Sequence, residues 1–453
     1  MNCNFPNAYW PACQSFGAGR SPFLQSGDLP TTSNFIEMTR LRRARLKKAG
    51  WINPYKYNRL IGMLLVFVGF FGCEHKNNIV NDFVPVLKIN PTQASESINL
   101  SDLVDSVYYI KLETNTQCIM GRITQLLIKR KYIYVADVQQ DMVFVFDKNG
   151  RFISRLDRKG RGEGEYNNLG YILVDESENY LEVLELRGKN SRRLIYTVPE
   201  FDLVGEELMF IPSGTSCMKV DSLYYFASLQ NDNVVNGKPT NASVIIVNPV
   251  SDIQNILFDK NIFTGNNNYS FFTESFTLNE AGELYTTLMF NNTFYQLSGW
   301  EASPVMAVDF GEYGIDNSIG LKSTEEQLRY FREEASNRAF FPVLTAHTEK
   351  LLAIFYTYAV DGGMGQQYIH LKDRNQIFHT QKIMDDVTSF TDRNYFCSSS
   401  IPFNHEIVYD ENYLVDIVLP SQYLKDERSV DVEGIGKITD QDNPIVLLMK
   451  LKE

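Results

Sequence analysis

The sequence predicts an all-β fold, a six-bladed β-propeller over residues 101–453 that is closed by pairing an N-terminal strand with a C-terminal one. Three observations lead to this prediction. A pattern of strands and turns recurs about every 50 residues, only one segment has a clear helical pattern, and an unmatched strand precedes the first repeat. The chain has 453 residues, 44% of them hydrophobic, so it can bury a large core.

The first repeat shows the pattern most clearly. Residues 132–136 and 142–146 are apolar runs with the length of buried strands. Asp147-Lys148-Asn149-Gly150 follows them, and Asn-Gly is the residue pair that a type I′ hairpin turn favours. The next strand then begins at Phe152. Short strands joined by tight turns are the content of one propeller blade.

The same succession of apolar strand and turn returns at regular intervals. Turns are centred near residues 149, 199, 249 and 299, and a fifth is centred near residue 374. The equal spacing of the first four is about the length of one four-stranded blade. The longer interval before the fifth turn predicts an insertion between two blades.

Residues 323–341 account for that longer interval, because they have the pattern of a surface helix. Ser323 and Glu326 have the spacing of a capping box, and Leu328, Phe331 and Ala335 fall on one helical face. The opposite side is charged. Two roles stay open for this helix, a decoration of the propeller surface or a lid or docking element for a partner.

The sixth blade is predicted to combine strands from both ends of the domain. Residues 104–112 form an apolar strand before the first repeat, and residues 444–449 form the last apolar strand. Neither strand has a complete sheet of its own. Pairing the two closes the ring and removes the free edges that an open array of sheets would present.

An export signal precedes the predicted propeller. Lys56 and Arg59 stand before the uncharged apolar residues 60–72, a run shorter than the roughly 20 residues of a membrane-spanning helix. The segment from Phe70 to Cys73 resembles the lipobox of bacterial lipoproteins. The resemblance implies a lipid on Cys73 and an outer-membrane anchor in the cell envelope, in either leaflet. The alternative is an uncleaved signal anchor with an incidental cysteine.

The regions on either side of the signal carry less information. Residues 1–59 are basic and lack periodicity, so we expect a disordered extension or, if translation starts at Met38, a partly untranslated one. Residues 74–100 are predicted to be a linker.

Charge and cysteine content exclude some classes of function. The net charge is −12, and because residues 1–59 are basic the remainder is more acidic still, which disfavours nucleic-acid binding. After Cys73 only Cys118, Cys217 and Cys397 remain, too few for a disulfide framework and without the spacing of a zinc site. We expect them to be buried free thiols.

The chain also resembles a known family, on the motifs at residues 109–113, 143–153, 160–166 and 443–447. In these motifs it is similar to six-bladed β-propeller lipoproteins of Gram-negative gut anaerobes, which are related in shape to NHL-repeat propellers. The likeness spans about residues 95–453. It implies the propeller fold and an envelope location, and it supplies no ligand.

The Gly-rich residues 160–166 have two interpretations. Closely spaced glycines can hold an anion, but this run lies between strands and contains two glutamates, so it does not fit a phosphate loop. A structural turn between blades is the favoured interpretation. The alternative is a ligand contact at the mouth of the central channel through Arg161, Glu165 or Tyr166.

No catalytic pattern is recognisable in the sequence. The histidines lie in no known motif, and adjacent carboxylates such as Asp385-Asp386 point to opposite faces of a strand; the histidines are His75, His347, His370, His379 and His405. No cofactor and no metal site are predicted, although Asp361-Gly362-Gly363 leaves a Ca²⁺ contact open.

Three functions therefore stay open. The favoured one is a binding or scaffold module of the cell envelope with a glycan, peptide or protein ligand, for which several loop aromatics could stack on sugars: Tyr269, Phe271, Phe272, Tyr395 and Phe396. A propeller enzyme, such as a metal-dependent lactonase or a polysaccharide lyase, is less favoured. The third is a purely structural envelope component.

Overall fold

The structure is a computed structural model, and it describes residues 84–228, 233–250, 253–258, 276–360, 364–388, 390, 412–424 and 428–452. The chain separates into two compact units, one that includes Val84–Glu453 and one that spans Ala12–Phe83. All described residues belong to the first unit. The predicted extension 1–59, the signal 60–73 with Cys73, and residues 74–83 lie outside the described residues.

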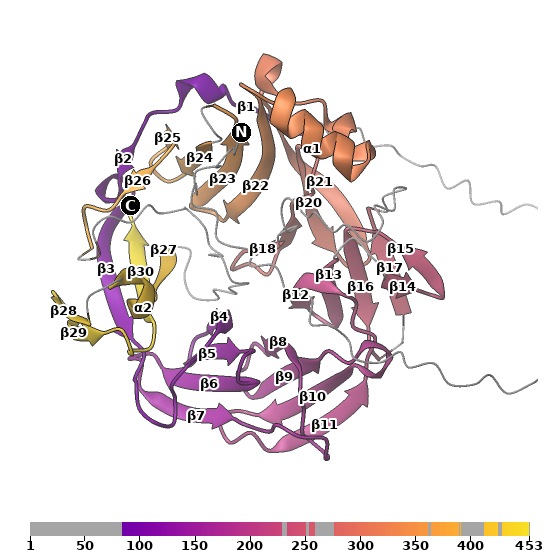
Figure 1. Ribbon diagram of the computed structural model, residues 1–453, viewed down its shortest axis with the longest axis vertical. Coiled ribbons are helices and arrows are strands. Elements are labelled where there is room, and N and C mark those ends of the chain that lie inside the picture. The colour runs from indigo at the N-terminus through magenta and orange to yellow at the C-terminus, as the bar shows by residue number, and fades with distance from the viewer. Residues whose placement is uncertain are drawn as a thin grey trace, which may run out of the picture. The chain divides into compact units, whose positions relative to one another are not determined.

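Six sheets of three to five strands surround a central axis, so the predicted six-bladed propeller is confirmed (Figure 1). From the centre outward, the strands of the first three sheets are as follows. The first has β4 (Ile123–Ile128), β5 (Tyr132–Asp137), β6 (Met142–Asp147) and β7 (Phe152–Leu156). The second has β8 (Leu169–Val174), β9 (Tyr180–Glu185), β10 (Arg192–Thr197) and β11 (Leu203–Leu208). The third has β12 (Gly214–Val220), β13 (Leu223–Ser228), β16 (Val244–Asn248) and β17 (Ile253–Leu257).

The remaining three sheets are less uniform. The fourth has β18 (Phe276–Leu278), β19 (Leu284–Thr286), β20 (Thr293–Ser298), β21 (Glu301–Asp309) and an added outer strand β1 (Val86–Lys88). The fifth has β22 (Ala339–His347), β23 (Leu351–Tyr358), β24 (Met364–Leu371) and β25 (Gln376–Thr380). The sixth, as far as it is described, has β27 (Tyr413–Val418), β30 (Ile445–Leu451) and β3 (Val104–Lys111).

All five turns that the sequence places near residues 149, 199, 249, 299 and 374 lie between the third and fourth strands of successive sheets, the first to the fifth. The repeat is therefore real and in register with the blades. It is visible in the sequence because the third strand of each of these five sheets has apolar residues in its second half and the turn after it is polar or contains Gly or Pro.

The predicted closure of the ring is also confirmed. Strand β3 pairs antiparallel with β30, with Val104 opposite Leu451 and Lys111 opposite Ile445, and β27 lies on the other side of β30. Asn443, just before β30, reinforces the junction. Its side-chain amide donates to the carbonyl oxygens of Glu113 (2.7 Å) and Cys118 (2.6 Å) and its oxygen accepts from the Met120 amide (3.1 Å).

The inserted helix exists but is shorter than predicted. Helix α1 spans Thr324–Glu333, and the predicted capping box between Ser323 and Glu326 is present. The expected extension to residue 341 is wrong, since Ala339 already begins the inner strand β22. Asn337 has φ 56, which ends a right-handed helix, and Phe340 and Phe341 are buried in the core instead of continuing a helical face.

Residues 84–100, assigned above to the linker, instead pack along the outer edges of three sheets, and we call residues 85–103 the strap. Strand β1 pairs in parallel with β21 of the fourth sheet, and β2 (Ile98–Asn99) pairs in parallel with β26 (Ile383–Met384) after the fifth. Ile89 and Leu100 are buried at 3% and 1% exposure. The strap also contains the 3-10 turns η1 (Pro91–Gln93) and η2 (Leu100–Asp102), and it leads directly into β3 of the sixth sheet.

The connections divide into two kinds, and in an antiparallel sheet the two kinds leave from opposite ends. Connections between first and second strands and between third and fourth strands are short, such as 129–131, 221–222 and 299–300. We call the end that carries them the turn face. Connections between second and third strands, and from one sheet to the next, include all the long ones, such as 310–338 and 419–444, although some are short, such as 138–141. We call that end the loop face.

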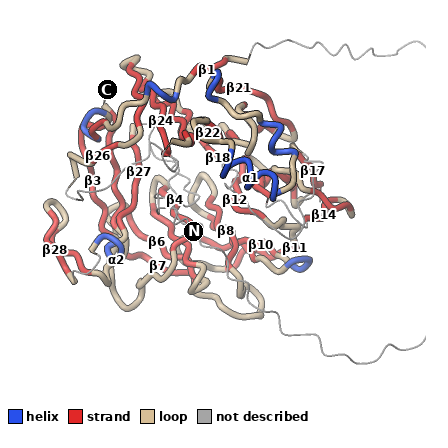
Figure 2. The backbone as a smooth tube through the Cα atoms, turned by 45° about the horizontal axis from the view of Figure 1, so that its top comes forward, coloured by secondary structure: helices blue, strands red, loops and turns tan. Residues whose placement is uncertain are grey.

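Apart from η1 and η2 of the strap, the described helices and inserted hairpins lie in loop-face connections, while strands make up most of the rest (Figure 2). These elements are η3 (Gly188–Asn190), β14 (Asn233–Val235), β15 (Lys238–Thr240), η4 (Gly311–Tyr313), η5 (Asn317–Leu321), α1, α2 (Pro420–Tyr423), β28 (Ser429–Val432) and β29 (Gly436–Thr439). No helix among the described residues is long and apolar enough to span a membrane.

The glycine of the first turn predicts a clear stability effect. Gly150 has φ +80, a Cβ there would lie 2.3 Å from the carbonyl oxygen of Lys111, and its own carbonyl accepts from the Glu113 amide at 2.8 Å. We expect Gly150→Ala to lower the free energy of unfolding by about 2–5 kcal/mol, from left-handed strain and from overpacking. Urea melts of the variant and the parent measure this loss.

Gly299 is the matched control for this substitution, since it occupies the equivalent turn of the fourth sheet. It has φ +58, but a Cβ there meets no atom within 4 Å. Gly299→Ala should therefore show the backbone strain alone, about 1–2 kcal/mol. Equal losses at the two positions would contradict the packing of the turn at Gly150 against the end of β3.

Candidate functional site

The loop face is the candidate functional surface, because it carries the elements that differ from sheet to sheet. The ring beneath it is held by side chains that reach from one sheet to the inner strand of the next. Gln125 of β4 donates to the carbonyl oxygen of Ile172 (3.2 Å) and accepts from its amide (2.7 Å). Thr277 of β18 donates in the same way to the carbonyl of Leu344 at 2.6 Å. The inner strand edges at these positions are therefore saturated, and the loops project from a rigid support.

The Gly-rich residues 160–166 lie in the loop-face connection between β7 and β8. Tyr166 is fully buried, and its hydroxyl donates to the Leu156 carbonyl at 3.5 Å. Burial raises the pKa of this phenol. The Glu165 carboxylate accepts from the amide of Gly162 at 2.8 Å, and Arg161 is exposed. Tyr166 has no exposed surface with which to touch a ligand, while a ligand contact through Arg161 or Glu165 stays a prediction.

The second half of this motif is held by the outer strands of the second sheet. The Gly164 amide donates to the Glu206 carboxylate of β11 (3.0 Å), and its carbonyl accepts from the Tyr196 hydroxyl of β10 (3.0 Å). These partners lie on the two strands farthest from the channel, so the motif from Gly164 onward serves as a fixed connection at the outer part of the blade.

Arg192 is the side chain that organises this region, and no sequence pattern pointed to it. It is 9% exposed and lies on β10, where its Nε donates to the fully buried Glu185 carboxylate at 2.7 Å. A terminal nitrogen is ion-paired with Glu206, and the other donates to the Glu165 carbonyl at 2.7 Å. One guanidinium thus joins β9, β10, β11 and the Gly-rich connection.

Three of the five histidines are described, and two are packed against tyrosines. His379 of β25 lies 2.6 Å from the Tyr356 hydroxyl, which in turn donates to the Gln366 side chain. His347 packs edge to face on Tyr285, with ring centroids 4.7 Å apart. Burial lowers the pKa of His347, and it lowers the pKa of His379 to about 4. Both histidines are therefore neutral at neutral pH, His347 in the packing between the fourth and fifth sheets and His379 in the packing within the fifth sheet.

The depressed pKa of His379 makes the fold sensitive to acid. In the unfolded chain this imidazole takes up a proton near its ordinary value of 6.5, whereas the folded protein resists until about pH 4. The unfolded state therefore binds more protons in this window, and the free energy of unfolding should fall as the pH is lowered from about 6.5 to about 4. Urea melts across this range measure the fall.

His379→Gln should make that pH dependence shallower, because the remaining amide has no proton to bind. His370→Gln is the control, since His370 lies on the adjacent strand β24 and bonds only to the side chain of Asn375 at 3.3 Å among the contacts described. If the two variants keep the same slope as the parent, His379 does not cause the loss of stability in acid.

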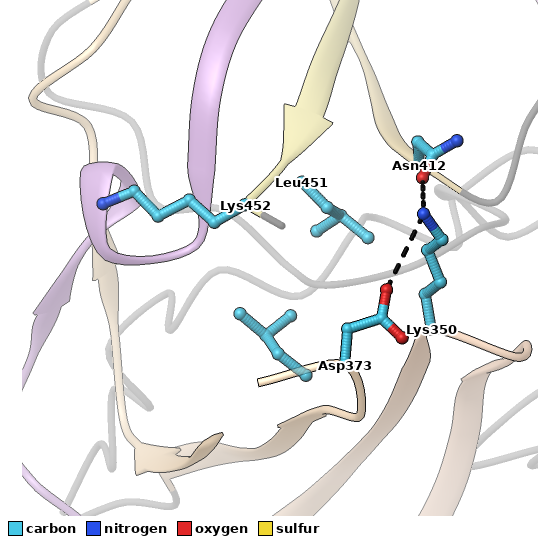
Figure 3. A pocket seen from close by; sticks show the side chains of 6 residues that line it. Lys350, Asp373, Asn412, Leu451 and Lys452 are labelled. Carbon is cyan, nitrogen blue, oxygen red and sulfur yellow. Dashed lines mark hydrogen bonds and ion pairs between the residues drawn. The ribbon is translucent and has the colours of Figure 1, made fainter. Parts of the chain in front are cut away.

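A small pocket lies between the fifth and sixth sheets on the turn face (Figure 3). Lys350, from the turn after β22, points at the side-chain oxygen of Asn412 and lies 3.7 Å from the Asp373 carboxylate. Leu371, Leu451 and Lys452 complete the wall. Since the Lys350 ammonium is already held by two side chains, this pocket joins neighbouring sheets and shows no group set up for chemistry.

Thiols and possible metal ligands are the remaining candidate groups. Cys118 and Cys217 are free and buried, as predicted, and burial raises the pKa of Cys118. Within the described part of the chain no three His, Cys, Asp or Glu side chains come together as a metal site. Other candidates lie outside the described residues, namely Cys397, His75, His405, Asp361-Gly362-Gly363 and the aromatics Tyr269, Phe271, Phe272, Tyr395 and Phe396.

The fold and its uneven connections define a six-bladed β-propeller whose inserted elements gather on one face. Residues 84–450 match the family described as "Domain of unknown function (DUF4934)", and the chain belongs to this family. The match begins at the strap and not at the first repeat, which agrees with the strap being part of the domain. No curated protein matches the chain.

Two solved structures are similar to this chain. A Bacteroides fragilis protein named "Putative exported protein" has 16% identity and a TM-score of 0.56, and the match covers 82% of this chain and 100% of that one. A member of the duf4221 family from Bacteroides vulgatus has 12% identity and a TM-score of 0.45, with coverage of 78% and 98%. The first likeness supports the fold.

Proposed function

We propose that this protein is an exported lipoprotein that binds an envelope glycan, peptide or protein through its loop face. The observation that carries the proposal is the uneven distribution of inserted elements, which lie in loop-face connections on a ring of regular sheets. Loops held by a rigid scaffold are where binding residues concentrate in proteins. The turn face has short connections and offers fewer side chains for a specific pocket.

The cell envelope is the proposed location for two reasons. The fold is similar to that of a Bacteroides fragilis protein whose name describes it as exported. The apolar residues 60–72 and Cys73 have the order of a signal and a lipid attachment site, as in the propeller lipoproteins that the chain resembles, including their NHL-like relatives. The described propeller begins at residue 84, so a lipid on Cys73 would tether it through a short segment.

Replacing the proposed lipid-bearing residue tests the anchor. We expect Cys73→Ala to move the protein from the membrane fraction to the soluble fraction and to abolish incorporation of a labelled fatty acid. Cys118→Ala is the control, because that buried thiol should have no effect on either readout. Fatty-acid labelling that persists in the Cys73→Ala chain would contradict attachment at this cysteine.

Binding is tested by presenting the chain to arrays of glycans and peptides, with and without a chelator. The face is then assigned by attaching a polyethylene glycol chain to an introduced cysteine, at Lys189→Cys on the loop face or at Glu349→Cys on the turn face. Both positions are exposed. The loop-face adduct should block binding and the turn-face adduct should not. The opposite result, or no binding on any array, would argue against the proposal.

A further inference from the structure

The turn face has a charge pattern that none of the functions above explains. The two turns of the first sheet, 129–131 and 148–151, are basic, with Arg130, Lys131 and Arg151 exposed. The turns of the next three sheets, 175–179, 198–202, 221–222 and 279–283, contain no Lys or Arg in their described residues. Their exposed carboxylates are those of Glu176, Glu200, Asp202, Asp221, Glu280 and Glu283.

Contacts between neighbouring turns show that these charges share one surface. The Lys131 ammonium donates to the carbonyl of Ser177 at 2.8 Å, which joins the basic turn of the first sheet to the acidic turn of the second. The Tyr225 hydroxyl of the third sheet donates to the Gly299 carbonyl in a turn of the fourth at 2.8 Å. The basic turns of the first sheet and the acidic turns of the next three sheets are therefore adjacent on the turn face, in the order of the sheets around the ring (Figure 1).

We propose that the turn face is the contact surface between two copies of this chain. A two-fold axis that lies in this face, between the first and second sheets, places the first sheet of each copy on the second sheet of the other. The exposed cations Arg130 and Arg151 then meet the exposed carboxylates Glu176 and Glu200 twice. A self-complementary surface of this kind is what a symmetric dimer requires.

The same axis brings a second pair of sheets together. It passes between the fourth and fifth sheets on the far side of the ring, so the turns of these two sheets face each other. The fifth sheet presents both signs there, with Glu349 and Lys350 in its inner turn 348–350 and Lys372, Asp373 and Arg374 in its outer turn 372–375, so the charge match rests on the first and second sheets. Val250, which is 85% exposed in a turn of the third sheet, lies on this face and would lose water in the contact.

The change from positive to negative charge between neighbouring sheets favours a second copy of the chain, and not an extended polyanion, as the partner of the turn face. A polyanion held by Arg130 and Arg151 would run past the carboxylates of the second sheet, which repel it. A second copy presents both signs in the matching order. This contact leaves the two loop faces pointing away from each other, so it is independent of the ligand proposed for the loop face.

Charge-reversal variants on the two sides of the proposed contact test whether this dimer forms. The chain used is the full chain with Cys73→Ala, so that a lipid does not drive association. One variant carries Arg130→Glu and Arg151→Glu, and the other carries Glu176→Lys and Glu200→Lys. No hydrogen bond or ion pair of these four side chains is described, and the one described interaction is that of Arg151 with the exposed Glu113 carboxylate. Interactions between exposed charges contribute little to stability, so the melting temperature of both variants should stay close to that of the parent. Sedimentation velocity measures the mass.

We expect the parent to dimerise at low ionic strength. The dissociation constant of this dimer should rise at least tenfold in about 0.5 M salt. Each variant alone should be monomeric, and an equimolar mixture of the two should restore the dimer. A matched pair of reversals on the loop face, Lys189→Glu with Glu163→Lys, should leave the parent dimer unchanged. A monomeric parent at low salt, or a mixture that stays monomeric, would overturn the proposal, whatever ligand the loop face binds.

Discussion

A chain that begins at Glu113 should not fold, whereas a chain that begins at Leu103 should fold with reduced stability. The first deletion removes β3, so that β30 loses the partner that closes the ring. The second removes residues 85–102 of the strap, with the buried side chains of Ile89 and Leu100, and keeps the buried Leu103. Burying two such side chains contributes about 3–6 kcal/mol, and the entropy of ordering the strap offsets part of it. We therefore expect a loss of about 2–5 kcal/mol for the Leu103 chain.

Circular dichroism and urea melts separate these outcomes, with the chain that begins at Pro85 as the reference. A synthetic peptide of residues 104–112, added to the Glu113 chain, is the control, because it should restore a cooperative melt if the missing strand is the cause. A Glu113 chain that melts like the reference would show that the ring does not depend on its closing strand.

The architecture was predictable because it repeats. Each turn between third and fourth strands follows an apolar strand, so the pattern around Asn149 and Gly150 could be recognised again in later sheets. Closure was predictable by elimination, since residues 104–112 had no sheet of their own. A repeat needs no single strong motif, because the spacing itself carries the information.

The strap was missed because parallel edge strands leave little trace in a sequence. Strand β1 has three residues, with the burial of its side chains alternating along Val86, Leu87 and Lys88, and β2 has two. Such short segments fall below the length at which periodicity can be read. The end of α1 was misplaced for a related reason, since Phe340 and Phe341 fit a helical face as well as an inner strand.

The candidate site was predictable only in outline. The Gly-rich connection was found from its composition, but its environment depends on Arg192, Glu185 and Glu206, which come from three different strands. An isolated arginine in a strand with alternating burial is indistinguishable from a surface residue until the strands are assembled. Sequence reasoning therefore finds the connection and misses the side chain that fixes it.

Replacing that side chain should have the second largest effect among these predictions. Arg192→Met removes the closer of the two guanidinium groups that face the fully buried Glu185 carboxylate, together with the bonds to Glu206 and the Glu165 carbonyl. Glu185 then keeps only Arg187, at 3.8 Å, and the Asn167 amide. Removing one partner of a buried ion pair costs up to about 3–5 kcal/mol. We expect a loss of this size in the free energy of unfolding, measured by urea melts at neutral pH.

Arg155→Met is the matched control, because Arg155 forms an exposed ion pair with Asp157, with side chains 38% and 36% exposed. Exposed pairs contribute about 0–1 kcal/mol, so this variant should stay close to the parent. Adding Glu185→Met to Arg192→Met should recover part of the loss, because no buried charge is then left without a partner. If Arg192→Met costs no more than Arg155→Met, the buried cluster does not hold the Gly-rich connection, and Glu185 must find another partner or reach water when the arginine is gone.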